Sequence, residues 1–489
     1  MNGAAYMEGF VGNPPFAGKN TITIANGPAY LDWLMVKHPE VKGHANTDLS
    51  AYFFRRAAEL IGPNGTIGFV ATNTIAQGDS RLMSLKILVD AGARIYDGVS
   101  SFRWPGAAAV AASTVHLAMG LPSRVPIALI LDGETVSAIN SRLNPKPERS
   151  ETRPLRVNAD IAFMGGKLVG VGLAVDEDEY AALIKQSAKN SQILRPYIGG
   201  EDVNSSPTGA HSRYVIDFTR HDLEEAKKWP ALLKIVEERV KPARMKDNRG
   251  TYKTYWWKPG ESGGALYQAL SGLSNCLVTA RVTKHLCFSL QPTIRFFSEA
   301  LYIFALSTHT AFAVLQSRVH EPWARLLSSS MKTDLRYAAS DCFDTFPFPG
   351  ADPREVIPEV EEAGREFYEE RARFMVATEQ GLTKTYNALK DPGNTDPAVL
   401  RLRRLTEAMD RAVLRAYGWT DLSENLPPYC PLTPAQQTAL QTFQDEVIDR
   451  LYQLNAHRAA LAAQSQPPTP KPKKPKSPKP PPTPQGTLF

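Results

Sequence analysis

Near its start the chain reads Phe10-Val11-Gly12-Asn13-Pro14-Pro15-Phe16, a short apolar run followed by an Asn-Pro-Pro-aromatic tetrapeptide. The apolar run predicts a short strand, and the two prolines fix φ in the segment that leaves it. Such a stiff segment would hold two hydrogen-bond acceptors in place, the Asn13 amide oxygen and the Pro14 carbonyl. A proline-stiffened turn with no chemical role is the alternative interpretation.

The tetrapeptide resembles motif IV, the catalytic loop of amino-methyltransferases, which methylate an exocyclic nitrogen of a base or an amide. The resemblance implies that Asn13, Pro14, Pro15 and Phe16 are catalytic. Asn13 and Pro14 would accept the two hydrogens of adenine N6 and aim its lone pair at the methyl group of S-adenosylmethionine. Phe16 offers a ring face for a base flipped out of DNA. Asn13 carries no charge, so it would position the amine rather than act as a general base.

Later stretches extend this resemblance to one family. The matching segments are residues 12–20, 48–53, 68–73 and 104–108. Together they are similar to the γ-class adenine-N6 DNA methyltransferases of type II restriction–modification systems, which join methylase and specificity domains in one chain. The family implies double-stranded DNA as substrate and S-adenosylmethionine as cofactor. It also suggests that Phe102 and Trp104 help to hold the flipped base, with packing of both rings in the core as the alternative.

The first 120 residues predict alternating strands and helices. After the strand at Phe10, the patterns predict a helix at Leu49–Leu60 capped by Asp48, a buried strand at Thr66–Asn73, a helix from about Ser80 to Ala91, and a strand within Ala107–Met119. This order fits the back half of a doubly wound, Rossmann-like α/β sheet. Only nine residues precede Phe10, and no glycine-rich cofactor turn is found. We therefore expect a separate or missing N-terminal methylase half to supply the cofactor site.

The rest of the chain divides by composition and by further matches to the family, at 195–202, 280–284, 336–349, 381–387 and 416–419. After the catalytic half at 1–120, four regions are expected. They are a strand-rich connector at 121–195, an α+β target-recognition domain at 196–350, a helical region at 351–466 and a disordered, proline- and lysine-rich tail at 467–489. Helices are predicted at about 222–240 and at 400–417, the latter ending at Gly418.

Residues 241–260 form the strongest basic patch outside the tail. Six cations, Lys241, Arg244, Lys246, Arg249, Lys253 and Lys258, stand against Asp247, and Tyr252, Tyr255, Trp256 and Trp257 are interleaved with them. Cations neutralise phosphates and aromatic rings stack on bases, so Arg249, Lys253 and Lys258 are predicted to bind DNA phosphates. Arginine can bridge guanine O6 and N7, so Arg281 and Arg336, together with Lys284, are predicted to read bases. A solvated loop around a buried tryptophan pair is the competing interpretation.

Composition limits other functions. Removing the five lysines of residues 467–489 from the net charge of +6 leaves +1, so affinity for DNA has to come from local patches. No apolar run is long enough to cross a membrane, and the N-terminus does not resemble a signal peptide. The four cysteines are far apart, which predicts reduced thiols in a cytoplasmic protein and no metal site.

The last five residues, Gln485-Gly486-Thr487-Leu488-Phe489, resemble the short Gln-x-x-Leu-Phe peptide with which bacterial replication and repair proteins bind the sliding clamp. Gln485 could hydrogen-bond at the rim of a pocket, while Leu488 and Phe489 fill it. The preceding tail would act as a semi-stiff tether and raise the effective concentration of the protein near new DNA. A chance match is the alternative.

Three functions remain open from the sequence. The first is a site-specific adenine-N6 DNA methyltransferase of a restriction–modification or phage-defence system, incomplete without its N-terminal half. The second is a catalytically inactive DNA-binding specificity module. The third is methylation of RNA or of a protein glutamine, against which the large recognition region argues, because such enzymes need little beyond the catalytic domain.

Overall fold

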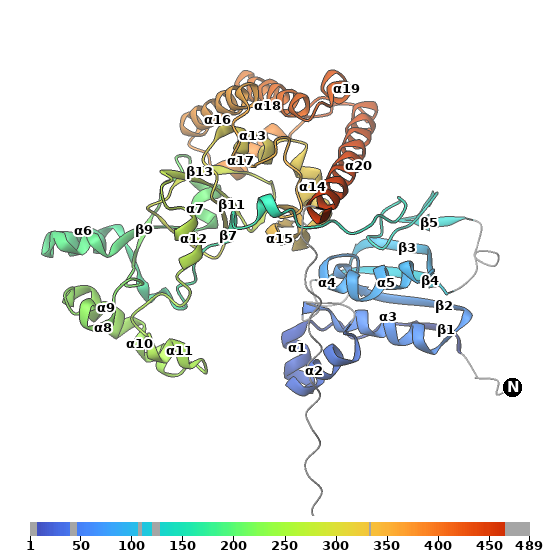
Figure 1. The fold of residues 1–489 in the computed structure, drawn as a ribbon, viewed down its shortest axis with the longest axis horizontal. Helices are drawn as coiled ribbons and strands as arrows, with labels where there is room; N and C mark the ends of the chain where they lie inside the picture. The colour runs from blue at the N-terminus through green and yellow to red at the C-terminus, as the bar shows by residue number, and fades with distance from the viewer. Residues whose placement is uncertain (1–6, 40–45, 106–109, 120–127, 332–333, 465–489) are drawn as a thin grey trace, which may run out of the picture.

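The computed structural model describes residues 7–39, 46–105, 110–119, 128–331 and 334–464 (Figure 1). The ribbon forms an arch. The N-terminal sheet stands on one side, the small sheets of the middle region stand on the other, and the long C-terminal helices lie across the top. The protein thus combines an α/β region, an α+β region and a helical region, as the sequence predicts.

The N-terminal sheet has six strands in the order β1-β2-β4-β3-β5-β6. Its strands are β1 (Met7–Gly12), β2 (Ile61–Thr72), β3 (Arg94–Arg103), β4 (Ala111–Ala118), β5 (Leu129–Leu131) and β6 (Glu134–Val136). β1 and β2 are parallel, with Gly12 opposite Phe69, and β4 is antiparallel to both β2 and β3. A parallel pair requires a crossover connection. The described part of this connection contains α1 (Lys19–Asn26), α2 (Pro28–Lys37) and α3 (Leu49–Leu60).

Helix α3 begins and ends where the sequence predicts. Asp48 Oδ1 accepts hydrogen bonds from the Ser50 amide at 3.0 Å and the Ser50 hydroxyl at 2.7 Å, so Asp48 caps the helix. The ring of Phe54 packs edge-on against Phe69 of β2, with centroids 5.1 Å apart. Phe69 alternates along β2 with residues that are less buried, and this period of two sets which face of the sheet the helix covers.

The helix predicted from Ser80 to Ala91 is present but irregular. A 3₁₀ turn, η2 (Asn73–Ala76), is followed by α4 (Gly78–Arg81), a π-helical stretch η3 (Leu82–Lys86) and α5 (Ile87–Asp90). Apolar periodicity cannot distinguish a π turn from an α turn, so the sequence pattern predicts one helix.

The middle region contains three small sheets, with the orders β14-β9-β10-β8, β13-β11-β15-β7 and β12-β17-β16. Their strands are β7 (Ala162–Met164), β8 (Ala174–Asp176), β9 (Leu194–Ile198), β10 (Arg213–Ile216), β11 (Asn275–Ala280), β12 (Val282–Thr283), β13 (Ser289–Pro292), β14 (Phe296–Phe297), β15 (Leu301–Phe304), β16 (Ser329–Met331) and β17 (Asp334–Arg336). We call the last of the three sheets, β12-β17-β16, the recognition sheet, because it carries Arg336, which the sequence predicts to read bases.

Short helices connect these strands. They are α6 (Glu177–Gln186), α7 (Gly200–Ser205), α8 (Leu223–Ala226), α9 (Pro230–Arg239), α10 (Lys241–Met245), α11 (Gly250–Thr254), α12 (Gly264–Ala269), α13 (His309–Gln316), α14 (His320–Leu327) and α15 (Ala339–Cys342). The single helix predicted at 222–240 is divided into α8 and α9, because Pro230 has no amide hydrogen to continue the helix and disfavours helical geometry at Trp229.

The C-terminal helices share a core with the middle region. They are α16 (Pro358–Thr378), α17 (Leu382–Leu389), α18 (Pro397–Ala416), α19 (Thr420–Glu424) and α20 (Pro434–Gln464). One hydrophobic cluster extends from Ile161 to Leu451. Within it the buried Arg318 Nε lies 2.6 Å from Asp410 Oδ2, so an ion pair joins the segment before α14 to α18. Helix α18 ends before Gly418, whose φ of 74° suits glycine, as the sequence predicts.

Among the described residues, no helix has the length and apolar character to cross a membrane, and no group of three or more His, Cys, Asp or Glu side chains could hold a metal ion. The four cysteines are buried free thiols. Burial raises the pKa of Cys287 and of Cys342 to about 12, which keeps these thiols protonated and unreactive.

Candidate functional site

The tetrapeptide Asn13–Phe16 leaves the carboxyl end of β1. Because β1 and β2 are parallel, it emerges at the edge of the sheet where β2 ends at Thr72, and ligands of α/β sheets bind at this edge. Pro14 is buried and anchors the loop, whereas Asn13 is exposed. Within the described part of the chain the Asn13 amide has no hydrogen-bond partner, so it is available to a substrate.

Trp104 lies against this loop. The ring centroids of Phe16 and Trp104 are 5.7 Å apart, and the rings meet edge to face at 75°. Trp104 follows β3, and its amide donates to the Val110 carbonyl at 3.0 Å, which ties the segment back to β4. Phe102 lies in β3 opposite Ala112 and, among the described residues, makes no ring contact with Phe16. The structure therefore brings Trp104, but not Phe102, to the loop.

A cavity of about 810 Å³ opens beside the loop, and we call it the central cavity. One wall comes from the N-terminal sheet, with Gly18 and the residues that end β2. The opposite wall comes from the middle region and includes Arg281, Tyr302 and Arg336. The central cavity therefore places two of the predicted base-reading arginines across from the predicted catalytic edge.

Arg281 and Arg336 lie close together, because Arg336 pairs with Val282, the residue after Arg281, across the recognition sheet. Arg281 Nη1 donates to the Glu299 carbonyl at 2.9 Å, and its guanidinium lies 5.8 Å from the Tyr302 ring. Arg336 is exposed, and its guanidinium has no hydrogen-bond partner among the described residues. Both side chains also line a neighbouring cavity of about 590 Å³.

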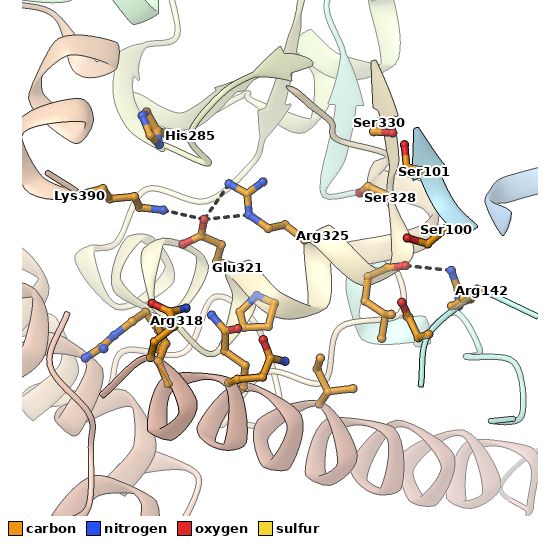
Figure 2. Close-up of a pocket in the computed structure, with 18 of the residues that line it drawn as sticks. Ser100, Ser101, Arg142, His285, Arg318, Glu321, Arg325, Ser328, Ser330 and Lys390 are labelled. Carbon is orange, nitrogen blue, oxygen red and sulfur yellow. Dashed lines mark hydrogen bonds and ion pairs between the residues drawn. The ribbon is translucent and has the colours of Figure 1, made fainter. Parts of the chain in front are cut away.

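Lys284 lies apart from the two arginines. It lines a third cavity of about 840 Å³, bordered by α14 and α20, and its Nζ donates to Asn387 Oδ1 at 2.8 Å. Figure 2 shows the neighbouring Lys390 and Arg325 pointing toward Glu321, at 3.0 and 2.8 Å. Burial alone would raise the pKa of Glu321, but these two cations outweigh it and lower the pKa to about 2.

The basic patch at 241–260 divides into buried and exposed parts. Trp256 and Trp257 pack in a hydrophobic cluster, so the competing interpretation of a buried tryptophan pair is correct for them. Arg244 is 2% exposed. Its guanidinium donates to the carbonyls of Leu168 at 2.6 Å and Trp256 at 3.2 Å, and also to that of Lys258. Arg244 thus holds the chain together and is not available to DNA.

The exposed cations of the patch are Lys246, Arg249 and Lys253. Arg249 pairs with Asp247 at 2.9 Å and lies over the Tyr252 ring at 4.1 Å. Lys258 is half-buried, and its Nζ donates to the Thr219 carbonyl at 3.2 Å. Of the three predicted phosphate ligands, Lys253 is therefore the most available and Lys258 the least.

The comparisons with known proteins divide the chain in two. Residues 4–128 match the family model of the MmeI DNA-methyltransferase domain, and residues 149–350 match that of the MmeI target recognition domain. DNA methyltransferase A of Bacillus subtilis (strain 168) is 26% identical over 423 residues, which cover 83% of this chain and 45% of the relative. This chain thus spans about half the length of the curated relative that it matches.

Two solved structures are similar to different degrees. The type IIL restriction–modification enzyme MmeI, solved in complex with DNA, gives a TM-score of 0.71 at 19% identity, covering 92% of this chain and 57% of that chain. At this identity the likeness concerns the fold. The type IIG restriction endonuclease BpuSI gives only 0.28 at 10% identity, covering 84% of this chain and 54% of that one, and supports no argument.

This chain therefore joins a DNA-methyltransferase domain to a target recognition domain, the fused arrangement of type II restriction–modification proteins. Both matches are to domains of MmeI, which confirms the predicted fusion of a methylase with a target-recognition domain and the predicted fold class.

Sequence reasoning assigned no role to Thr72, Asn73 or Gln77, which line the central cavity. Their position in the sequence could have indicated a place in the site, because polar residues directly after a buried strand lie at the ligand-binding edge of an α/β sheet.

Proposed function

We propose that the chain is the catalytic and recognition part of a site-specific DNA methyltransferase that transfers a methyl group from S-adenosylmethionine to adenine N6. The observation that carries this proposal is the Asn13–Phe16 loop at the carboxyl end of β1, beside a cavity whose far wall holds Arg281 and Arg336. The loop is followed two residues later by Gly18, which lines the same cavity as Arg281 and Arg336. A loop and cations placed in this way suit an enzyme that binds double-stranded DNA and acts on one of its bases.

The loop explains how a weak nucleophile would react. The lone pair of adenine N6 is delocalised into the ring, so the amine needs help to attack. Asn13 Oδ1 and the Pro14 carbonyl would accept its two hydrogens and turn the lone pair out of the ring plane. Phe16 and Trp104 would hold the flipped base. S-adenosylmethionine, when bound, supplies the methyl group, but no described residue forms the glycine-rich turn that would hold it.

The exposed edge of β1 favours the proposal that a second segment, which carries the cofactor site, packs against this sheet. Among the described residues β1 is the outer strand of its sheet, and its Met7 and Val11 side chains are 59% and 94% exposed. Ile24, Trp33 and Val36 of α1 and α2 are exposed as well. An unpaired strand edge with apolar side chains is a template for strand addition. We propose that an N-terminal methylase half, as a separate or preceding segment, packs here.

We expect this chain alone to bind S-adenosylmethionine weakly or not at all in a calorimetric titration. Methylation of DNA should appear when the proposed N-terminal half is added. Val11→Asp should prevent methylation after this addition, because it places a charge on β1, where the N-terminal half is proposed to pack. Leu432→Asp, at a position 66% exposed, is the matched control and should not. Micromolar binding by the chain alone would contradict the proposal. If the completed protein binds DNA without methylating it, the alternative function, an inactive specificity module, holds.

Two sets of cations should affect DNA binding differently. Neutralising Arg249, Lys253 and Lys258 should weaken binding to every sequence and flatten its salt dependence, by about 0.9 in the log–log slope for each phosphate that is no longer neutralised. Replacing Arg281, Arg336 or Lys284 by alanine should instead relax sequence choice, with Lys284 the least effective because it lies in another cavity. Affinities for random DNA and for DNA that carries the preferred sequence, titrated at several salt concentrations, measure the salt dependence and the sequence preference. Equal effects of the two sets on both DNAs would contradict the division.

The proposed clamp-binding residues, Gln485, Leu488 and Phe489, lie outside the described residues, and the proposal remains as the sequence makes it. A fluorescently labelled peptide of residues 467–489 should bind purified sliding clamp at tens of micromolar or tighter in an anisotropy titration. The peptide with Leu488→Ala and Phe489→Ala should not bind, and binding that survives this change would remove the proposal.

A further inference from the structure

A pair of hydrogen bonds joins the two walls of the central cavity. Gln77 Nε2 donates to the Ser330 hydroxyl at 3.1 Å, and the Ser330 amide donates to Gln77 Oε1 at 3.0 Å. Gln77 follows the η2 turn of the N-terminal sheet, whereas Ser330 lies in β16, 253 residues further along the chain. Both residues also line the 840 Å³ cavity, so the pair stands where the two cavities meet.

The side-chain amide of Gln77 acts as a peptide group would. Its Nε2 donates to the Ser330 hydroxyl, and its Oε1 accepts from the Ser330 backbone amide, which belongs to β16. The other edge of β16 is paired with β17, with Ser330 opposite Leu335 and Ser329 opposite Arg336. Gln77 therefore docks on the outer edge of the recognition sheet, as a further strand would.

Gln77 is itself held firmly at the catalytic edge. The backbone amide of Gln77 donates to the backbone carbonyl of Thr74 at 2.9 Å, and the backbone carbonyl of Gln77 accepts from the Arg81 amide at 3.1 Å. Thr74 is two residues beyond the end of β2. A short, hydrogen-bonded path thus leads from the edge that carries Asn13 to the sheet that carries Arg336.

We propose that Gln77 is a positioning residue that sets the register between the bases read by the recognition sheet and the base placed beside Asn13. The inference rests on the proposed function, because it needs a target base. Successive base pairs are about 3.4 Å apart along DNA, so a shift of the recognition sheet by that distance would present a neighbouring base to the catalytic loop. The two hydrogen bonds between Gln77 and Ser330 oppose such a shift.

The first test needs no catalysis. Nitroxide labels on Glu59→Cys in α3 and Lys384→Cys in α17, both exposed positions, report the distance between the two walls, and the four native cysteines are buried. In the DNA-bound chain we expect one narrow distance. Gln77→Ala should broaden it, whereas Gln437→Ala, an exposed glutamine of α20 that lines only the 840 Å³ cavity, should not. An unchanged distribution in Gln77→Ala would overturn the proposal.

The second test maps the methylated adenines base by base in the completed protein. Losing the two hydrogen bonds corresponds to about tenfold in an equilibrium, so Gln77→Ala should place roughly ten times more methyl groups off the main position, with DNA affinity nearly unchanged. Ser330→Ala keeps the backbone bond and should have a smaller effect. The double variant should be no worse than Gln77→Ala, and additive effects would show that the two residues act independently and overturn the proposal.

The outcomes separate the two ideas. If the unaltered protein methylates no adenine, the proposed function fails, and the distance measurement still decides whether Gln77 couples the walls. If methylation occurs at one position in both the unaltered protein and Gln77→Ala, the proposed function stands and the role of Gln77 is refuted.

Discussion

Replacing Asn13 by alanine should abolish methyl transfer by the completed protein while leaving its affinity for DNA nearly unchanged. Asn13 is exposed at the end of β1 and would act on the reacting amine rather than on phosphates. A preorganised hydrogen bond that strengthens in the transition state contributes about 3–4 kcal/mol, so the rate should fall by a factor of about 10²–10³. Single-turnover methyl transfer and a DNA titration measure the two quantities.

Asn20→Ala provides the control for this prediction. Asn20 is exposed in α1, seven residues after Asn13, and its replacement removes the same amide from the same stretch of chain. We expect it to change neither rate nor affinity. A rate for Asn13→Ala close to that of the unaltered protein would refute the catalytic role of Asn13.

Arg244→Met is expected to destabilise the middle region by about 3 kcal/mol, although Arg244 belongs to the basic patch. Burial lowers the pKa of Arg244, and the guanidinium is retained there because it donates to backbone carbonyls. Removing it leaves these carbonyls buried without a donor, at a cost of roughly 1–3 kcal/mol for each group. Denaturant unfolding followed by tryptophan fluorescence measures the loss, since Trp256 and Trp257 pack in the affected cluster.

Lys253→Met separates stability from charge. Lys253 is an exposed cation of the same patch, so its replacement should lower DNA affinity at low salt and leave the unfolding midpoint unchanged. If Arg244→Met instead kept full stability and weakened only DNA binding, Arg244 would be a phosphate ligand and not a structural residue.

The sequence predicted those features of the fold that depend on a few neighbouring residues. The cap at Asp48, the end of α18 before Gly418 and the strand before Asn13 each depend on a few adjacent residues. Tertiary neighbours decided the rest. Arg281 and Lys284 are three residues apart, yet they line different cavities, because β12 carries the chain from one to the other. No pattern near Gln77 could identify Ser330 as its partner.

The shared core of the middle region and the C-terminal helices bears on how such genes can recombine. A junction at residue 350 would separate the Arg318–Asp410 pair and expose apolar side chains on both sides, including Phe346 and Val413. Crossovers within 161–451 should therefore yield insoluble hybrids. Junctions in the connector before residue 161 should leave the core intact, so natural exchange between related genes would transfer the recognition region and its helices as one inherited unit.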